Sequence, residues 1–278
     1  MGLNTPDPPT PLARDRDRCH ILPMSEGVPE TVIEVTGLSK TFDGVHAVED
    51  VSFTVARGQT VALLGANGAG KTTTISMLLG VLLPSAGAIR VLGEDIVRHR
   101  HRVLGRINFS SPYVDLPRRL TVEQTLKFFA RLYGVPDPAA RVQALVEELD
   151  LAELMTQRLG RLSAGQKTRV SLAKALINAP EILFLDEPTA SLDPDTADWM
   201  RGYLEAYQAA SRTAILLASH NMLEVERLCS VVLMMRRGRI VDRGAPDELI
   251  RRYGRADMEQ VFLDIARNGA NAPASAAQ

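Results

Sequence analysis

The segment from Gly65 to Thr72 combines residue types that bind phosphate. It reads Gly-Ala-Asn-Gly-Ala-Gly-Lys-Thr, which fits the pattern G-x4-G-K-S/T. Glycines let backbone N–H groups approach phosphate oxygens, and a helix start adds partial positive charge. Lys71 can neutralise the outer phosphates, and the Thr72 hydroxyl can ligate Mg²⁺. The pattern predicts a nucleotide site made of Gly65, Ala66, Asn67, Gly68, Ala69, Gly70, Lys71, Thr72 and Thr73.

A pair of acids follows a second apolar segment. Residues 182–185 read Ile-Leu-Phe-Leu, and Asp186 and Glu187 come directly after them. An acid at the carboxyl end of a buried parallel strand lies where such folds bind ligands. Asp186 is expected to hold Mg²⁺ through water, and Glu187 to polarise the attacking water. An Asp-Glu pair alone is more often a solvated turn, but the phosphate loop about 115 residues earlier favours the functional interpretation.

Short apolar runs alternate with helical patterns along the chain. Residues 60–64, 182–185 and 214–217 predict buried strands, and residues 231–242 predict a hairpin across Gly238. Strands separated by helices predict an α/β fold with a mainly parallel core sheet. The stretch from about 110 to 180 is mostly helical and is expected to be an insertion between two core strands. Helices are expected at about 71–80, 121–133, 138–148, 164–178, 195–209 and 221–228.

Composition narrows the class of protein. The 278 residues carry a formal net charge of -1, which gives no general attraction to nucleic acid or anionic lipid. Two cysteines, Cys19 and Cys229, fit a reducing compartment. No apolar run is long enough to cross a membrane, and the N-terminus has no apolar signal core, so a cytoplasmic location is expected. The proline-rich residues 1–30 predict a disordered leader, with Met24 as a hypothetical true start.

A third motif separates families that share a phosphate loop. Leu162-Ser163-Ala164-Gly165-Gln166 resembles the signature of ABC ATPases, with Ala164 in place of the usual first Gly. Ser163 is a good N-cap residue, and the small residues leave backbone N–H groups open. Residues 190–193 resemble the D-loop, His220 resembles the switch histidine, and Phe42 resembles the aromatic residue that stacks on adenine. The resemblance covers residues 31–245 and leaves 246–278 as C-terminal helices and a frayed tail.

This resemblance implies a P-loop NTPase core, an N-terminal antiparallel β subdomain and a helical subdomain at about 110–180. It implies an ATP-hydrolysing subunit of an exporter, on the cytoplasmic side of the membrane, that works through a separate permease subunit. Two copies would bind ATP and Mg²⁺ head to tail, each phosphate loop facing the signature of the other copy. Glu187, His220 and Lys71 would be catalytic. The partner contacts on ATP would come from Ser163, Ala164, Gly165, Gln166 and Asp193.

The sequence departs from the family at one position. The family places a Gln after the strand that here reads Arg-Ile-Asn-Phe, residues 106–109, but Ser110 and Ser111 follow. Either serine is expected to take the place of the Gln, with altered contact to metal or water, and Asn108 lies close by. A soluble ABC ATPase without a transport role and a regulatory subunit with weak hydrolysis are the alternatives. The sequence shows no long coiled coil of the kind usual in soluble ABC ATPases, which argues against the first alternative. The missing Gln leaves the second alternative, a regulatory subunit, open.

Two basic runs lie outside these motifs. Residues 98–102 read Arg-His-Arg-His-Arg, and Arg118-Arg119 lies in the expected helical insertion. Either run could contact lipid headgroups or a membrane partner. For the first run a solvated helix face is the favoured interpretation, and for the second the two interpretations stay open.

Overall fold

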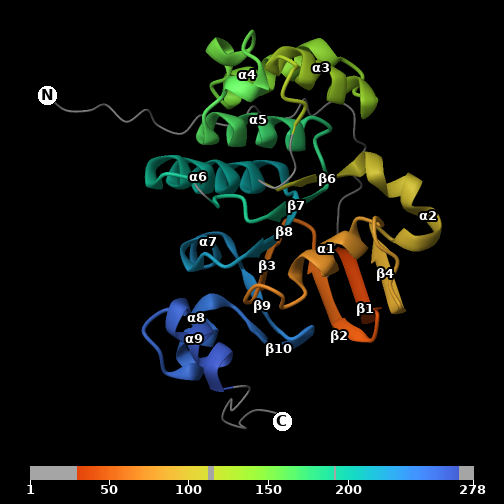
Figure 1. Cartoon of the computed structure of the whole chain (residues 1–278), viewed down its shortest axis with the longest axis vertical. Coiled ribbons are helices and arrows are strands. Elements are labelled where there is room, and N and C mark those ends of the chain that lie inside the picture. Colours follow the sequence, from red (N-terminus) through yellow and green to blue (C-terminus); the bar gives the residue numbers. More distant parts are fainter. Residues whose placement is uncertain (1–29, 112–115, 191, 269–278) are drawn as a thin grey trace, which may run out of the picture. The chain divides into compact units, whose positions relative to one another are not determined.

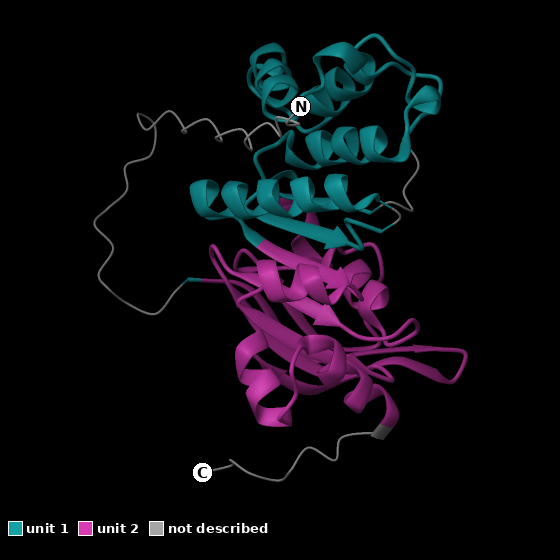
Figure 2. Ribbon diagram, turned by 90° about the vertical axis from the view of Figure 1, so that its left-hand side faces the viewer, with its two compact units in different colours: residues 1–30, 105–214 teal, residues 31–104, 215–278 magenta. Residues whose placement is uncertain are grey.

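The computed structural model describes residues 30–111, 116–190 and 192–268 (Figure 1). The chain forms two compact units, which Figure 2 shows in different colours. The sheet unit holds the described residues of 31–104 and 215–278, and the helical unit holds those of 105–214 together with Glu30. The expected leader with Met24 and Cys19, and the expected frayed end after residue 268, lie outside the described residues.

The first sheet of the sheet unit is antiparallel and has the strand order β2-β1-β4-β5. Along residues 51–55 of β2, buried and exposed side chains alternate strictly, as they do in a sheet covered on one face. This sheet is the antiparallel part that the family resemblance implied. Its strands are β1 Thr31–Phe42, β2 Val45–Ala56, β4 Ala86–Val91 and β5 Glu94–Asp95.

Strand β4 was not expected from the sequence. It begins Ala-Gly-Ala, and neither residue type favours strands. Its second half pairs with β1, where Ile89 lies opposite Val35 and Val91 lies opposite Ile33. All four of these side chains are buried, so cross-strand packing determines the strand where local propensity does not.

The second sheet of the sheet unit has the order β10-β9-β3-β8. β3 runs parallel to β8 and β9, and all five of its residues are buried. β9 and β10 form the predicted hairpin, which turns through Arg237 and Gly238 at φ 47° and 80°. The mainly parallel α/β core is therefore confirmed. The strands are β3 Thr60–Leu64, β8 Ala214–Ser219, β9 Val231–Arg236 and β10 Arg239–Gly244.

The helices of the sheet unit connect these strands and follow them. α1 follows β3 after the loop of residues 65–70, and α7 follows β8 after two residues. The described part of the unit ends with two short helices after β10. The bounds are α1 Lys71–Leu78, α2 Ile96–Val103, α7 Met222–Leu228, α8 Pro246–Tyr253 and α9 Met258–Asn268.

The helical unit contains two parallel strands and a group of helices. β6 pairs with β7, and all five residues of β7 are buried. Within its core the Tyr203 hydroxyl donates to Glu148 at 2.9 Å, which links α6 to α4. Burial raises the pKa of Tyr203, so this donor keeps its proton. The elements are β6 Ile107–Ser110, α3 Val122–Leu132, α4 Pro138–Glu148, α5 Ala164–Leu176, β7 Ile182–Asp186 and α6 Pro194–Ser211.

A half-buried lysine ties α5 to β6 within the helical unit. Lys174 Nζ donates to Asn108 Oδ1 at 3.1 Å and to the Phe109 carbonyl oxygen at 3.0 Å. It also lies 5.5 Å from the ring centroid of Phe129. Burial disfavours the charged ammonium and lowers the pKa of Lys174 to about 8. The group that joins the two elements therefore titrates close to neutral pH.

Replacing Lys174 with Met is expected to change how stability depends on pH. The pKa of Lys174 is about 8 when folded and 10.5 when unfolded, so between these values the unfolded chain binds more protons. The parent's free energy of unfolding should therefore rise relative to that of the variant by ~3 kcal/mol across this interval. Below pH 8, Lys174 is protonated in both the folded and the unfolded chain, so the difference in unfolding free energy between the parent and the variant does not change with pH. Urea unfolding at several pH values measures this, and parallel profiles for the two chains would contradict it.

Candidate functional site

The phosphate loop connects β3 to α1 through close backbone packing. A Cβ on Gly65 would lie 2.5 Å from the Met235 carbonyl oxygen, and a Cβ on Gly70 would lie 2.6 Å from that of Ala47. Gly70 is also the N-cap residue of α1 at φ 105°, a conformation that favours glycine. Both glycines are therefore required by geometry. Between them the loop presents three exposed residues, Ala66, Asn67 and Gly68.

Lys71 lies at the start of α1 and folds back over the loop. Its Nζ donates to the Gly65 carbonyl oxygen at 2.5 Å and to that of Ala66 at 3.3 Å. The side chain is buried, whereas the neighbouring Thr72 is exposed and Thr73 is half-buried. A buried ammonium beside the N-terminus of a helix forms a site that attracts an anion. The loop, Lys71 and Thr72 thus fit the phosphates of a nucleotide.

Phe42 and His220 lie in the same unit as the phosphate loop. Phe42 ends β1 and is exposed, with Lys40 Nζ 4.8 Å from its ring centroid. His220 follows β8, is exposed, and comes directly before Asn221, the N-cap residue of α7. An exposed aromatic ring and an exposed imidazole are available to a nucleotide, but their proposed roles stay predictions.

The acidic pair lies in the helical unit at the end of β7. Asp186 and Glu187 are both buried. Glu187 has φ 53°, a left-handed conformation that is uncommon for a residue with a side chain. Its carbonyl oxygen accepts from the N–H of Ala190 at 3.0 Å, which closes a tight turn. Backbone strain of this kind gathers at functional sites, because the surrounding structure has to hold it in place.

The signature segment forms the capped start of α5 in the helical unit. Gln166 N donates to Ser163 Oγ at 3.2 Å, and Ser163 N donates to Gln166 Oε1 at 2.9 Å. This reciprocal pair is a capping box, which fixes the direction of the first turn. Gln166 is therefore a structural cap of this helix as well as a predicted contact to ATP, and Ala164 is the first residue of the helix.

Thr196 joins the signature segment to the D-loop, a link that the motifs did not reveal. Its N donates to Asp193 Oδ1 at 3.0 Å and its hydroxyl donates to Asp193 Oδ2 at 2.8 Å. These bonds hold the pKa of Asp193 below its ordinary value. A Cβ on Gly165 would lie 3.2 Å from the side chain of Thr196. The spacing Asp-x-x-Thr predicts the helix cap, but only the fold reveals the contact with Gly165. Ser191 of the D-loop lies outside the described residues.

The place of the missing Gln lies at the end of β6. Ser110 is half-buried and Ser111 is buried. Asn108 Oδ1 accepts from Lys174, and Asn108 Nδ2 donates to Asn178 Oδ1 at 2.9 Å. Asn108 is therefore part of the packing between β6 and α5. The substitution of the Gln by one of the serines stays a prediction.

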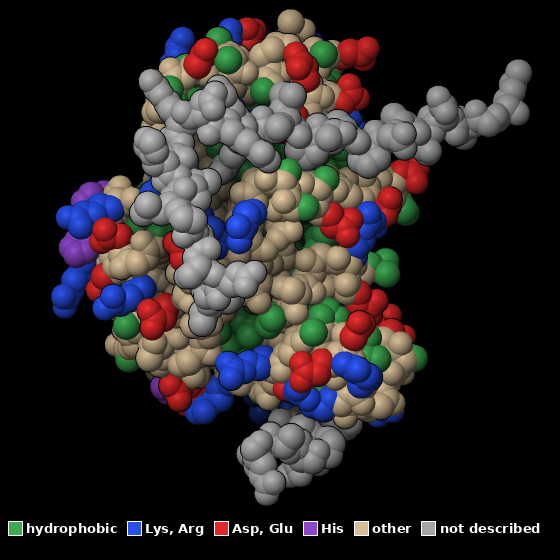
Figure 3. Space-filling model, turned by 180° about the vertical axis from the view of Figure 1, so that it is seen from behind, with side chains coloured by type: hydrophobic (Ala, Val, Ile, Leu, Met, Phe, Trp, Pro, Cys, Tyr) green, Lys and Arg blue, Asp and Glu red, His purple; other side chains and the backbone are tan. Residues whose placement is uncertain are grey.

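The basic run 98–102 lies mainly on the exposed side of α2. Arg98 pairs with Asp95 at 3.8 Å, and Arg102 lies 3.4 Å from Glu94. Figure 3 shows histidine and basic side chains together at the left-hand edge, where α2 lies. Arginines interspersed with carboxylates are typical of a solvated helix face, the interpretation favoured from the sequence. Arg118 and Arg119 are exposed in a turn of the helical unit.

The described residues of each unit thus hold part of the predicted site. The sheet unit carries the phosphate loop, Phe42 and His220, and the helical unit carries the two acids, the signature segment and Asp193. No described helix combines the length and the apolar character that crossing a bilayer requires. The buried strand, loop and helix define a P-loop nucleotide-binding protein.

Known proteins are similar to this chain in sequence and in fold. The family model described as ABC transporter matches residues 48–190. The Nod factor export ATP-binding protein I of Ralstonia nicotianae is 37% identical over 245 residues, which cover 87% of this chain and 76% of that protein. The ABC transporter ATP-binding protein NatA of Bacillus subtilis (strain 168) is 36% identical over 239 residues, which cover 84% of this chain and 97% of that protein.

A solved structure supports the same assignment. The structure of an ATP-binding subunit of an ABC transporter superposes with a TM-score of 0.77 and 29% sequence identity. The match covers 85% of this chain and 100% of that one. The chain therefore belongs to the family of ABC transporter ATP-binding proteins, the family that the signature segment resembled, and this family consists of ABC ATPases.

Replacing Gly165 with Ala is expected to impair hydrolysis without unfolding the chain. Alanine favours helix, but its Cβ would lie 3.2 Å from Thr196 and would shift that side chain or the helix start. We expect ATP hydrolysis to fall roughly tenfold, while binding of ADP to the phosphate loop is unchanged. Steady-state kinetics and ADP titration measure the two effects.

The double variant Gly165→Ala with Thr196→Ala is the matched control. Removing the Thr196 side chain makes room for the new methyl group, so hydrolysis should recover above that of the Gly165→Ala chain. A double variant whose loss equals the product of the two single losses would contradict this account of the contact.

Proposed function

We propose that this chain binds and hydrolyses ATP as the energy-coupling subunit of an exporter. The observation that carries the proposal is the arrangement of Lys71, which is buried at the start of α1 and bonded to the loop carbonyl oxygens of Gly65 and Ala66. An amine held beside the start of a helix attracts an anion, and a loop lined by backbone N–H groups suits a triphosphate. Membership of the ABC transporter family supports ATP as that triphosphate.

Catalysis is proposed to consist mainly of positioning and charge stabilisation. Lys71 would neutralise the outer phosphates, and Glu187 would orient water for in-line attack on the γ-phosphate. His220 would contact the γ-phosphate and hold the geometry of the transition state. The left-handed turn at Glu187 supports its role, because it fixes the direction of a buried carboxylate. Phe42 is the proposed surface on which adenine stacks.

Magnesium is the proposed metal, with Thr72 and Asp186 as the residues that hold it. The hydroxyl of Thr72 is exposed in the first turn of α1, and Asp186 ends a buried strand, so both offer the oxygen ligands that Mg²⁺ prefers. The phosphates of the nucleotide and water would supply the remaining ligands of the ion. The ion would neutralise charge that develops on the phosphates.

Each ATP is proposed to lie between two copies of the chain. One copy would supply the phosphate loop, and the other would supply Ser163, Gly165 and Asp193. The capping box directs the first turn of α5, whose free N–H groups and dipole would meet the γ-phosphate. Hydrolysis removes this anion, and the two copies then separate. Nucleotide therefore acts as a switch between a closed and an open dimer.

Export through a separate membrane subunit is supported by the relatives. One relative is named for the export of Nod factor, and another is named an ABC transporter ATP-binding protein. We infer that this chain likewise acts with an integral membrane permease, at the cytoplasmic side of the membrane. The permease would contain the pathway of the transported substrate.

Replacing Glu187 with Gln is expected to trap the dimer. Glutamine keeps the size of the side chain but cannot polarise water as a carboxylate does, so ATP would be bound and not split. Hydrolysis should fall at least about 100-fold, and size-exclusion chromatography in saturating MgATP should show a dimer. The parent chain under the same conditions is the control. A monomer for the variant in MgATP would count against the composite site.

A further inference from the structure

Helices α5 and α6 lie side by side in the helical unit, as Figures 1 and 2 both show. α5 begins after Ser163 of the signature segment and α6 begins after Asp193 of the D-loop, and both of these cap residues are exposed. A Cβ on Gly165 would lie 3.2 Å from the side chain of Thr196, so the helices approach closely at their first turns. In the proposed dimer both helix starts face the ATP of the other copy, so their relative position has to be held.

A cation–π contact joins the second turns of the same two helices. The guanidinium carbon of Arg169, on α5, lies 4.5 Å from the ring centroid of Trp199, on α6. Arg169 comes four residues after Gly165, and Trp199 comes three residues after Thr196, so this contact lies one helical turn beyond the first. The indole face is the aromatic surface that attracts a guanidinium most strongly. The two contacts together therefore set how α5 and α6 lie beside each other near their starts.

Both partners of this contact are held by further interactions. Trp199 stacks on Tyr203, with ring centroids 5.7 Å apart and planes inclined at 24°, and the Tyr203 hydroxyl donates to Glu148 of α4. Arg169 Nη1 also lies 3.5 Å from Asp150 Oδ2, just after α4. Because Asp150 is exposed, this ion pair is screened by solvent, and the indole is the stronger restraint on the guanidinium.

We propose that Arg169 and Trp199 are positioning residues, which hold the signature segment and Asp193 in the geometry that the ATP of the other copy requires. The inference rests on the proposed composite ATP site and adds two residues that the motifs do not contain. Neither side chain contacts nucleotide or reacting atoms in this scheme. Without the indole the two helix starts are free to shift, and a shift of about 1 Å in a catalytic group can lower a rate by orders of magnitude.

Three substitutions test the contact itself by steady-state kinetics and ADP titration. Trp199→Ala should lower ATP hydrolysis roughly tenfold and leave binding of ADP to the chain's own phosphate loop unchanged. Arg169→Met removes the cation but keeps the aromatic packing of α6, and it should cause a similar loss. Trp199→Phe keeps a ring face for Arg169 and should stay within about twofold of the parent. A Trp199→Ala chain as active as the parent would overturn the proposal.

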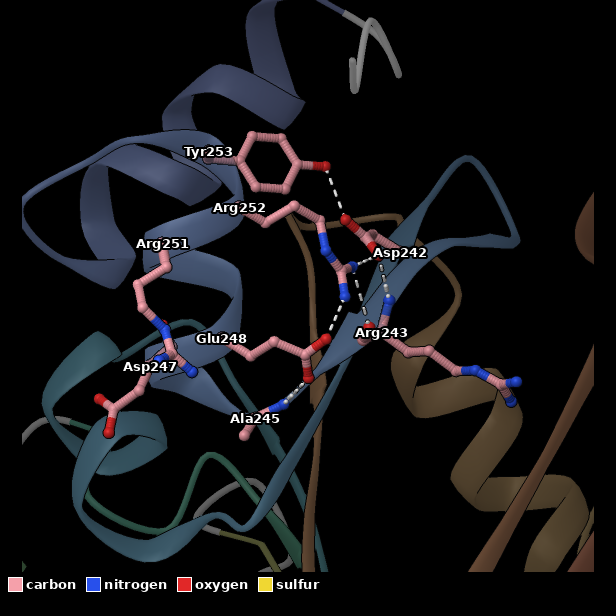
Figure 4. Close-up of polar contacts among 8 residues, drawn as sticks. All are labelled: Asp242, Arg243, Ala245, Asp247, Glu248, Arg251, Arg252 and Tyr253. Carbon is pink, nitrogen blue, oxygen red and sulfur yellow. Dashed lines mark hydrogen bonds and ion pairs between the residues drawn. The ribbon is translucent and has the colours of Figure 1, made fainter. Parts of the chain in front are cut away.

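Arg252→Met is the matched control, because Arg252 is an arginine held by carboxylates in the sheet unit (Figure 4). It pairs with Asp242 of β10 at 2.5 Å and with Glu248 of α8, and Asp242 also accepts from the Tyr253 hydroxyl at 2.9 Å. None of these residues belongs to the proposed ATP site. Arg252→Met should lower the unfolding temperature and leave hydrolysis by the folded chain unchanged. Equal losses of hydrolysis from Arg252→Met and Arg169→Met would overturn the proposal.

An excess of the Lys71→Ala chain shows which copy's ATP depends on Trp199. This chain has a damaged phosphate loop but an intact signature segment, which it would offer to the phosphate loop of a Trp199→Ala chain in a mixed dimer. Activity per Trp199→Ala chain should therefore rise to within about twofold of that per parent chain in the same excess. A gap that stays near tenfold would place the effect on the chain's own site and overturn the proposal.

The Gly165→Ala chain in the same excess is the reference mixture, because its defect also lies in the signature segment. Its activity should rise in the same way. A rise for Gly165→Ala without one for Trp199→Ala would reject the positioning role alone. No rise for either variant would reject the composite site and the positioning role with it.

Discussion

The attraction between phosphate and the start of a helix is the interaction on which this chain depends. In the sheet unit, a fully buried strand leads into a loop with two obligatory glycines, and α1 begins directly after it. Lys71 is buried at that point, and its Nζ donates to the carbonyl oxygens of Gly65 and Ala66. A cation beside the N-terminus of a helix attracts an anion. ATP is the proposed source of that anion.

In the helical unit, the start of a second helix, α5, is proposed to attract phosphate in the same way. A capping box fixes the first turn of α5, and Gly165 leaves room for the side chain of Thr196 beside this turn. The Thr196 hydroxyl in turn donates to Asp193. The capping box and the bonds to Asp193 stabilise their own helices, but Gly165 does not, because glycine favours helix less than alanine does. A glycine at this position is consistent with a surface that meets an anion held by another molecule. In the proposed dimer, that anion is the γ-phosphate of the ATP bound to the other copy.

Much of this arrangement could be read from the sequence, because it depends on local patterns. The continuous apolar run of β3, the glycines and Lys71 predict a phosphate site, and Asp186 and Glu187 follow an equally clear strand. The comparisons confirm the family that the signature segment resembled. By contrast, β4 depends on packing against β1, and the contact of Gly165 with Thr196 joins segments about 30 residues apart. Lys174 likewise bonds to Asn108 and Phe109, which lie about 65 residues earlier in the chain, and no periodicity or motif reveals these contacts.

The central claim, that one ATP site is built from two copies, is tested most directly by mixing two defective chains. Lys71→Ala damages the phosphate loop, and Gly165→Asp puts a carboxylate where the γ-phosphate should meet the signature segment. Each variant alone should be almost inactive, but an equimolar mixture should regain ATPase activity, because a mixed dimer contains one intact loop facing one intact signature. A mixture as inactive as its two components would contradict the account.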